Sequence, residues 1–259
     1  MRIALGVEYN GTNFFGWQVQ LEQRTVQYCL QQALSKVANH PIKIIAAGRT
    51  DSGVHALQQV VHFDTNVIRD ERNWILGLNT NLPSDINVTW AKVVDNDFSA
   101  RFSALNRQYR YLIMNRVSRS SIYANKMWWT FKPLDMKRMQ AAADLLIGHH
   151  DFSAFRAKDC QAHSPIKTVE KIQLIKQGDC IAIDVKAQSF LHHMVRNIVG
   201  VLVPIGEGNK SVEWAREVLE SRDRGQGGIT SPPDGLYFID VEYPTHYSLP
   251  KVSAFPVVW

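Results

Sequence analysis

Short runs of apolar residues, several of them alternating with polar residues, recur along the chain and predict β-strands. These runs occupy residues 1–9, 42–47, 59–64, 87–94, 107–114, 170–176, 180–187 and 235–242. Turn sequences separate some of them: Asn10-Gly11 follows the first run, and Gly178-Asp179 joins two runs into a predicted hairpin. The chain is therefore expected to be rich in paired strands.

Apolar residues at helical spacing predict helices between these strands. Thr25 can cap a helix whose apolar side contains Val26, Leu30 and Val37. Further helices are predicted over residues 69–78, over 134–146 with an end at Gly148, from near Phe190 to Val203, and after Ser211. Strands in adjacent groups with helices interspersed favour an α+β fold with a mainly antiparallel sheet over a doubly wound parallel fold.

The predicted helix over residues 190–203 is apolar around most of its circumference. At about 100° per residue its apolar members cover an arc of roughly 220°, which is typical of a buried helix. The remaining wedge collects His192, His193, Arg196, Asn197 and Gly200. An arginine on a buried helix usually has a carboxylate partner, and Asp51 is the predicted partner of Arg196. Structural alternatives for that partner are Glu8, Asp64 and Asp184.

The composition is that of a compact protein rather than a disordered, collagenous or coiled-coil chain. Of 259 residues, 45% are hydrophobic and 20% charged, enough for one large or two modest domains. The apolar stretch 198–205 is far shorter than the roughly 20 residues that span a bilayer. The start of the chain carries Arg2 and Glu8 and lacks the apolar core of a secretory signal, and the three cysteines form no CxxC pair. We therefore expect a cytoplasmic protein without a membrane segment or a disulfide framework.

The excess of positive charge lies in the second part of the chain. The net charge is +5, and residues 1–105 hold nine basic and nine acidic residues, whereas residues 106–259 hold 20 and 15. The segment 98–134, called the basic window below, contains no Asp or Glu. Its cationic and aromatic residues are Phe98, Arg101, Phe102, Arg107, Tyr109, Arg110, Tyr111, Arg116, Arg119, Tyr123, Lys126, Trp128, Trp129, Phe131 and Lys132. This mixture is typical of surfaces that bind RNA phosphates and unstacked bases, and equally of an aromatic core with a solvated basic rim.

The segment 48–55, Gly-Arg-Thr-Asp-Ser-Gly-Val-His, lies between two apolar strands and begins with a glycine-bounded loop. A carboxylate on such a loop is presented at the end of a sheet, where Asp51 can act as a nucleophile or a general base while it is ionised. The alternative is a plain turn in which Asp51 bonds its own backbone. No Walker loop or GxGxxG sequence is present, which argues against a nucleotide cofactor.

Three groups contain residues of the kind that bind metals: His149-His150-Asp151, Cys160 with His163, and His192-His193. Adjacent histidines point to different sides of a helix or strand, and neither HExxH nor a paired CxxC is present. The sequence therefore predicts no metal site.

Five segments, in order, resemble the motifs of the tRNA pseudouridine synthase A family. They are 48–55, 107–111 (Arg-Gln-Tyr-Arg-Tyr), 151–156 (Asp-Phe-Ser-Ala-Phe-Arg), 190–200 and 235–237 (Gly-Leu-Tyr), and with residues 3–9 they extend the resemblance over nearly the whole chain. Ser52 stands where alanine is commoner in the family motif. The resemblance implies an enzyme that converts uridine to pseudouridine at positions 38, 39 and 40 in the anticodon stem-loop of tRNA.

The same resemblance implies an α+β fold of two pseudo-symmetric RNP-like or ferredoxin-like domains that share an extended, mainly antiparallel sheet, with helices on one side and a central basic cleft. The domains would be 1–105, with the aspartate loop, and 106–259, with the basic window and the Arg196 helix. A homodimer that acts on tRNA without a cofactor is also implied. By position, Asp51 would be the catalytic aspartate, Arg49 would help displace the target nucleotide, Tyr109 would stack on the uracil, Arg196 would pair with Asp51, and Leu236 would form part of the apolar wall.

Two other functions are compatible with parts of the sequence. A non-catalytic RNA-binding protein would share the basic window but would have no need to bring Asp51 and Arg196 together. A hydrolase would use Asp51 with His55, or a Ser–His pair, but no GxSxG elbow or third orienting residue is present. Isomerisation leaves the mass of the RNA unchanged and hydrolysis does not, so a mass measurement separates these reactions.

Overall fold

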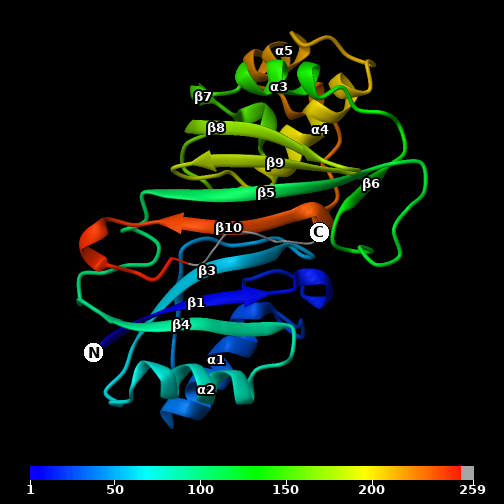
Figure 1. The fold of residues 1–259 in the computed structure, drawn as a ribbon. Helices are drawn as coiled ribbons and strands as arrows, with labels where there is room; N and C mark the ends of the chain where they lie inside the picture. Colours follow the sequence, from blue (N-terminus) through cyan, green and yellow to red (C-terminus); the bar gives the residue numbers. More distant parts are fainter. Residues whose placement is uncertain (252–259) are drawn as a thin grey trace. The chain divides into compact units, whose positions relative to one another are not determined.

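The computed structural model describes residues 1–251, and the chain divides into two compact units. The first unit comprises Met1–Arg107 together with residues 237–251 of the described chain, and the second comprises Gln108–Leu236. Both units contain strands and helices, which Figure 1 colours along the sequence. Within residues 1–251, no helix is both long and apolar enough to cross a membrane.

The first unit is built on a sheet with the strand order β4-β1-β3-β10, seen in Figure 1. Its elements are β1 (Arg2–Tyr9), α1 (Val26–Ala38), β2 (Ile45–Ala46), β3 (His55–Asp64), α2 (Glu71–Asn81), β4 (Ile86–Val94) and β10 (Leu236–Glu242). β1 is antiparallel to both β3 and β4. The other edge of β3 is shared, because β2 pairs antiparallel with it at His62 and β10 pairs parallel with it at His55. The loop that leads into β3 therefore enters the sheet beside β10.

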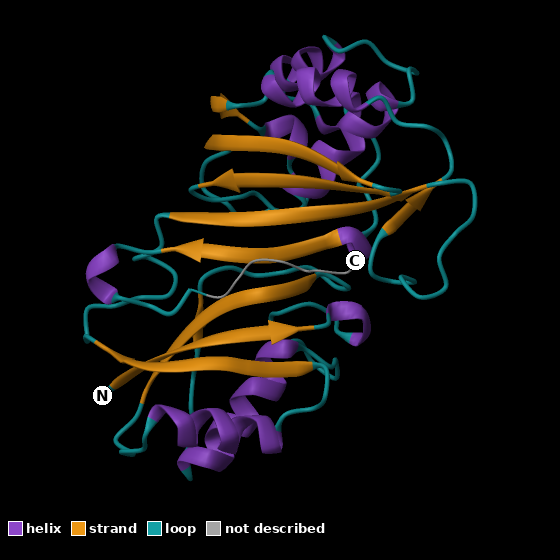
Figure 2. Ribbon diagram, in the orientation of Figure 1, coloured by secondary structure: helices purple, strands orange, loops and turns teal. Residues whose placement is uncertain are grey.

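Two helices of the first unit bury apolar faces beside this sheet. α1 buries Leu30 and Leu34 and contacts α2, which lies against β4 and buries Trp74 and Leu78. Figure 2 shows α1 and α2 as neighbouring helices next to the strands. The ring of Trp74 meets that of Phe63 on β3 edge to face, with 5.3 Å between their centroids. This packing fixes the end of β3 against α2.

The second unit has a sheet with the strand order β5-β9-β8-β7. Its elements are β5 (Asn106–Asn115), β6 (Trp128–Thr130), α3 (Met136–Asp144), β7 (Gly148–Asp151), β8 (Ile166–Gln177), β9 (Cys180–Ala187), α4 (Met194–Gly206) and α5 (Trp214–Ser221). β7, β8 and β9 pair antiparallel, and the short β6 runs parallel to β5. α3 lies against β8, and α3, α4 and α5 contact one another. Nearly every residue of α4 is buried, as its wide apolar arc predicts.

These elements confirm the predicted α+β class with mainly antiparallel pairing. The first strand, the helix after Thr25 and the hairpin that turns at Gly178 all lie where the residue pattern places them. The parallel pairing of β10 with β3 is an exception within the first unit. The pseudo-symmetry of the two domains and the central basic cleft stay predictions.

Some predicted boundaries are wrong. The helix predicted from Phe190 begins at Met194, because His193 has a φ of 63°, in the left-handed region that a right-handed helix does not contain. His192 and His193 therefore lie in the preceding turn and not on the polar wedge of the helix. The strand predicted over 42–47 is reduced to β2, and β6 and β7 were not predicted because strands of two to four residues carry too little alternation.

The compact units differ from the predicted domains 1–105 and 106–259 at the last strand. Of the described residues, 237–251 group with the first unit, because β10 pairs with the start of β3. Strand pairing between segments this far apart in the sequence leaves no signal in local patterns. Residues 252–259 of the predicted second domain lie outside the described residues.

Candidate active site

Asp51 lies on the loop between β2 and β3, and its side chain is half-buried. The loop turns tightly there, since the backbone N–H of Val54 donates to the carbonyl of Asp51 at 3.2 Å. Gly53 has a φ of 79°, a left-handed conformation that glycine adopts without strain. The sequence thus places the carboxylate on a turn whose shape glycine allows.

Buried hydrogen bonds anchor this loop on both sides of Asp51. The hydroxyls of Tyr9 and Thr50 are hydrogen-bonded at 2.8 Å in the interior, and the backbone N–H of Trp17 donates to the carbonyl of Thr50 at 3.0 Å. The N–H of Gly53 donates to the carbonyl of Phe14 at 3.2 Å. Burial raises the pKa of Tyr9 far above its usual value, so its hydroxyl stays protonated. Asp51 is therefore presented on an ordered loop.

The approach of residues 14–17 to this loop depends on Gly16. A Cβ atom at Gly16 would lie 2.7 Å from the carbonyl oxygen of Thr50, and its φ is 81°. Both facts exclude a larger residue. The Gly-Trp sequence that follows two phenylalanines is thus a structural requirement of the aspartate loop.

Arg49 is exposed on the same loop. The residue before it, Gly48, is held by Gln59 of β3, whose amide nitrogen donates to the Gly48 carbonyl at 2.7 Å. Thr50, on its other side, is buried. The backbone of Arg49 is thus fixed at both neighbours while its guanidinium faces solvent.

His55, the partner considered for a hydrolase, has a structural position at the start of β3. It is 2% exposed, and its Nδ1 accepts a hydrogen bond from the N–H of Gly11 at 3.0 Å. Its ring stacks on Tyr237 of β10 with 4.6 Å between centroids and 24° between planes. This environment gives His55 the role of joining the start of β3 to the turn that follows β1 and to β10, and argues against the hydrolase interpretation.

The second unit holds the other predicted site residues. Tyr109 on β5 is buried, and the edge of its ring meets that of Phe190, with 4.9 Å between centroids and 81° between planes. Leu236, at the start of β10, is also buried. The structure thus buries both Tyr109 and Leu236, and their contacts with a substrate stay predictions.

Arg196 lies in the first turn of α4 and is half-buried. Its Nε donates to the carbonyl of Ser231 at 2.7 Å, and the N–H of Ser231 donates back to the Arg196 carbonyl at 3.3 Å. Two of the alternative partners are engaged by other arginines, Asp184 by Arg110 at 2.6 Å and Asp64 by Arg2 at 2.8 Å. The pairing of Arg196 with Asp51 stays a prediction.

The sequence placed Asn197 beside Arg196 on the polar wedge but did not identify its partners, Arg224 and Thr230. Asn197 is 2% exposed, and its Oδ1 accepts hydrogen bonds from Thr230 at 2.7 Å and from Arg224 at 3.0 Å. Arg224 also donates to the carbonyl of Gly228 at 2.8 Å. The glycine-rich sequence 224–228 is the one local signal that marked this segment.

The basic window is divided between core and surface. Phe98, Tyr109 and Tyr111 are buried, and Arg110 is paired in the interior, as the core interpretation expects. The exposed members include Arg101, Phe102, Arg119, Trp129, Phe131 and Lys132. RNA contacts stay a prediction for this second set.

Several histidines considered as metal ligands have hydrogen-bond partners of another kind. His149 Nδ1 lies 2.9 Å from the hydroxyl of Thr168, and His150 Nε2 lies 2.9 Å from the carbonyl of Ile147. The two side chains point to different neighbours, as expected for consecutive residues of a strand.

The fold and the loop together define an α+β protein that presents one carboxylate on an ordered turn beside an exposed arginine. The family model described as tRNA pseudouridine synthase matches residues 6–103 and 142–244. The tRNA pseudouridine synthase A of Nitrosococcus oceani is 53% identical over 259 residues and covers 100% of both chains. That of Alcanivorax borkumensis is 52% identical over 257 residues, covering 99% of this chain and 96% of the relative. The chain belongs to the tRNA pseudouridine synthase family.

Proposed function

We propose that this protein is an isomerase that converts uridine to pseudouridine at positions 38, 39 and 40 in the anticodon stem-loop of tRNA, with Asp51 as its catalytic carboxylate. The family match and a relative named tRNA pseudouridine synthase A at 53% identity support the reaction. The observation that carries the role of Asp51 is the anchored loop, which presents a half-buried carboxylate at the start of β3. A non-catalytic RNA-binding protein has no need of such a loop.

The reaction breaks the N1–C1′ bond, replaces C5–H by C5–C1′ and returns a proton to N1, so no electrons are gained or lost. For this reason we propose that it proceeds without a cofactor. The ionised Asp51 can attack C1′, attack the base or take a proton from C2′, and each route needs the carboxylate anion. Carboxylates support related chemistry at C1′ in glycosidases.

Inside a stacked stem the reacting atoms are covered, so the target nucleotide must leave the helix at a cost of a few kcal/mol. We assign the displacement of this nucleotide to Arg49, because it is exposed on the same fixed loop as Asp51. Stacking on the uracil is assigned to Tyr109, whose ring orientation is restricted by its contact with Phe190. Leu236 would complete the apolar wall.

Arg196 is the proposed ion-pair partner of Asp51. The hydrogen bond from its Nε to Ser231 supports this role, because it restricts the guanidinium to one orientation. A guanidinium beside a carboxylate favours the carboxylate anion. The cluster of Asn197, Arg224 and Thr230 would act through Ser231 to keep the guanidinium in that orientation.

The test is the isosteric substitution Asp51→Asn, with Asp97→Asn, an exposed acid of the same unit, as the matched control. Asp51→Asn should abolish the release of tritium from tRNA that contains 5-tritiated uridine, while tRNA affinity stays within a few-fold of wild type. The control should retain wild-type release. Undiminished release by Asp51→Asn would refute the assignment.

A further inference from the structure

A phenylalanine and an arginine stand exposed on a turn of the first unit. Phe102 has 80% of its surface exposed, and the Cζ of the exposed Arg101 lies 5.2 Å from the centre of its ring. Phe98, four positions earlier, is fully buried and fixes the start of this segment in the core. The segment is therefore anchored in the core at Phe98, while Phe102 on the turn that follows is exposed to solvent.

Reciprocal hydrogen bonds close this turn. The N–H of Ser99 donates to the hydroxyl of Ser103 at 2.9 Å, and the N–H of Ser103 donates to the carbonyl of Ser99 at 2.9 Å. The N–H of Phe102 donates to the Ser99 hydroxyl at 3.3 Å. A backbone held in this way presents Phe102 in one place, which lowers the entropy lost when a ligand binds.

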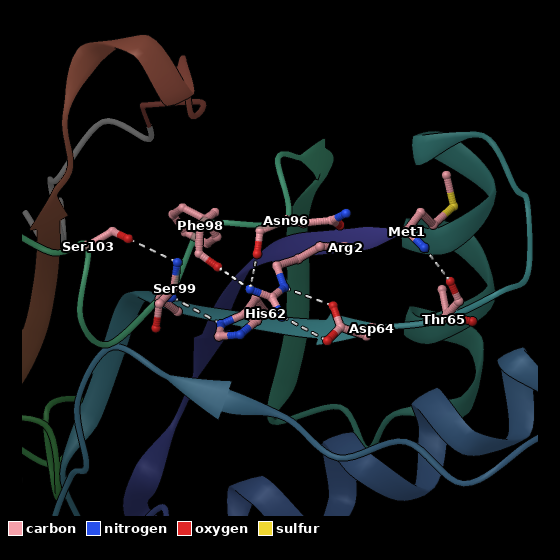
Figure 3. Close-up of polar contacts among 10 residues, drawn as sticks. Met1, Arg2, His62, Asp64, Thr65, Asn96, Phe98, Ser99 and Ser103 are labelled. Atoms are coloured by element: carbon pink, nitrogen blue, oxygen red, sulfur yellow. Dashed lines mark hydrogen bonds and ion pairs between the residues drawn. The ribbon is translucent and has the colours of Figure 1, made fainter.

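Figure 3 shows how β1 and β3 support the start of the turn. Arg2 donates to the carbonyls of Asn96 at 2.6 Å and Phe98 at 2.8 Å, and its other nitrogens bind Asp64. The Nδ1 of buried His62 accepts a hydrogen bond from the N–H of Ala100 at 3.0 Å. The turn is thus joined to the sheet that carries the aspartate loop.

Arg107 connects the turn directly to the aspartate loop. Its Nη2 donates both to the carbonyl of Arg101 at 2.6 Å and to the carbonyl of Ala47 at 3.1 Å. Ala47 is the first residue after β2, at the start of the loop that carries Asp51. Because one nitrogen binds both carbonyls, the turn lies beside the base of that loop.

We propose that the turn 99–103 is a contact site for the substrate RNA, in which Phe102 stacks on an unpaired base and Arg101 binds an adjacent phosphate. The proposal rests on the proposed function and selects, from the basic window, the residues that make this contact. An exposed aromatic ring stacks on any base, and the guanidinium supplies the charge that a phosphate requires. The absence of acidic residues from 98–134 leaves this charge unopposed within the segment.

The test measures the affinity of the full-length protein for unmodified tRNA. Phe102→Ala and Phe102→Leu should each weaken binding about tenfold, whereas Phe102→Trp should bind as well as wild type, because only a ring can stack. Arg101→Ala should lower the slope of log affinity against log salt by about 1. Arg72→Ala, an exposed arginine on α2, is the matched control and should change neither affinity nor slope.

Wild-type affinity of Phe102→Ala, or of Phe102→Leu, would overturn the stacking contact, and an unchanged salt slope of Arg101→Ala would overturn the phosphate contact. The same variants should keep the wild-type melting temperature, because both side chains are exposed; a lowered melting temperature with unchanged affinity would assign the turn to folding alone. Failure of the wild-type protein to form pseudouridine would refute the proposed function and not the binding result. The two proposals therefore fail separately.

Discussion

Arg110 of β5 and Asp184 of β9 form a buried ion pair, and removal of either partner alone should lower the free energy of unfolding substantially. Its two contacts are Nε to Oδ1 at 2.6 Å and Nη2 to Oδ2 at 2.7 Å. The side chains are only 10% and 9% exposed. A guanidinium is always protonated in proteins, so Arg110 stays charged when Asp184 is lost. Breaking a buried pair leaves such a charge uncompensated and typically destabilises by about 3–5 kcal/mol.

Urea unfolding followed by circular dichroism provides the assay. Asp184→Asn should lower the free energy of unfolding by about 3 kcal/mol, the low end of that range, because both side chains retain some contact with water. The double variant Arg110→Met with Asp184→Leu should lose less than the single variant, since no charge remains buried. Asp179→Asn, from an exposed pair with Arg116 at 3.6 Å, should cost less than about 1 kcal/mol. A loss below about 0.5 kcal/mol for Asp184→Asn would refute this reasoning.

Two further predictions concern stability. Burial lowers the pKa of His62 from its usual 6.5 to about 4, so between these values only the unfolded chain takes up the proton, and the free energy of unfolding should fall as the pH drops. The free energy of unfolding should fall by on the order of 2 kcal/mol over this pH range. In urea titrations at several pH values, His62→Gln should remove this pH dependence. If the variant shows the same pH dependence as wild type, the role of His62 is contradicted. Gly200→Ala should lower stability by about 1–3 kcal/mol, because its Cβ would lie 1.8 Å from the carbonyl oxygen of Ile229. Gly77→Ala on α2 meets only side-chain atoms at 3.3 Å and should be neutral or stabilising in thermal melts, and equal effects of the two substitutions would count against this packing argument.

Local patterns predicted the elements whose signals are local. The helix after Thr25, the hairpin at Gly178 and the glycine-bounded loop around Asp51 all depend on residues close together in the chain, and all are present. The start of α4 could not be predicted in this way. Its apolar spacing continues back to Phe190, while the left-handed conformation of His193 depends on contacts that periodicity does not contain.

The choice of partners was decided only in three dimensions. The sequence offered Arg196 several carboxylates, and the structure shows Asp184 taken by Arg110. Likewise, the unopposed charge and aromatic content of the basic window were evident from composition, but its division between core and surface was not. Composition and spacing determine which residue types lie on one strand or turn, because these are local properties of the backbone. Which carboxylate meets which guanidinium, and which ring stays exposed, depends on the packing of distant segments, and only the tertiary structure decides it.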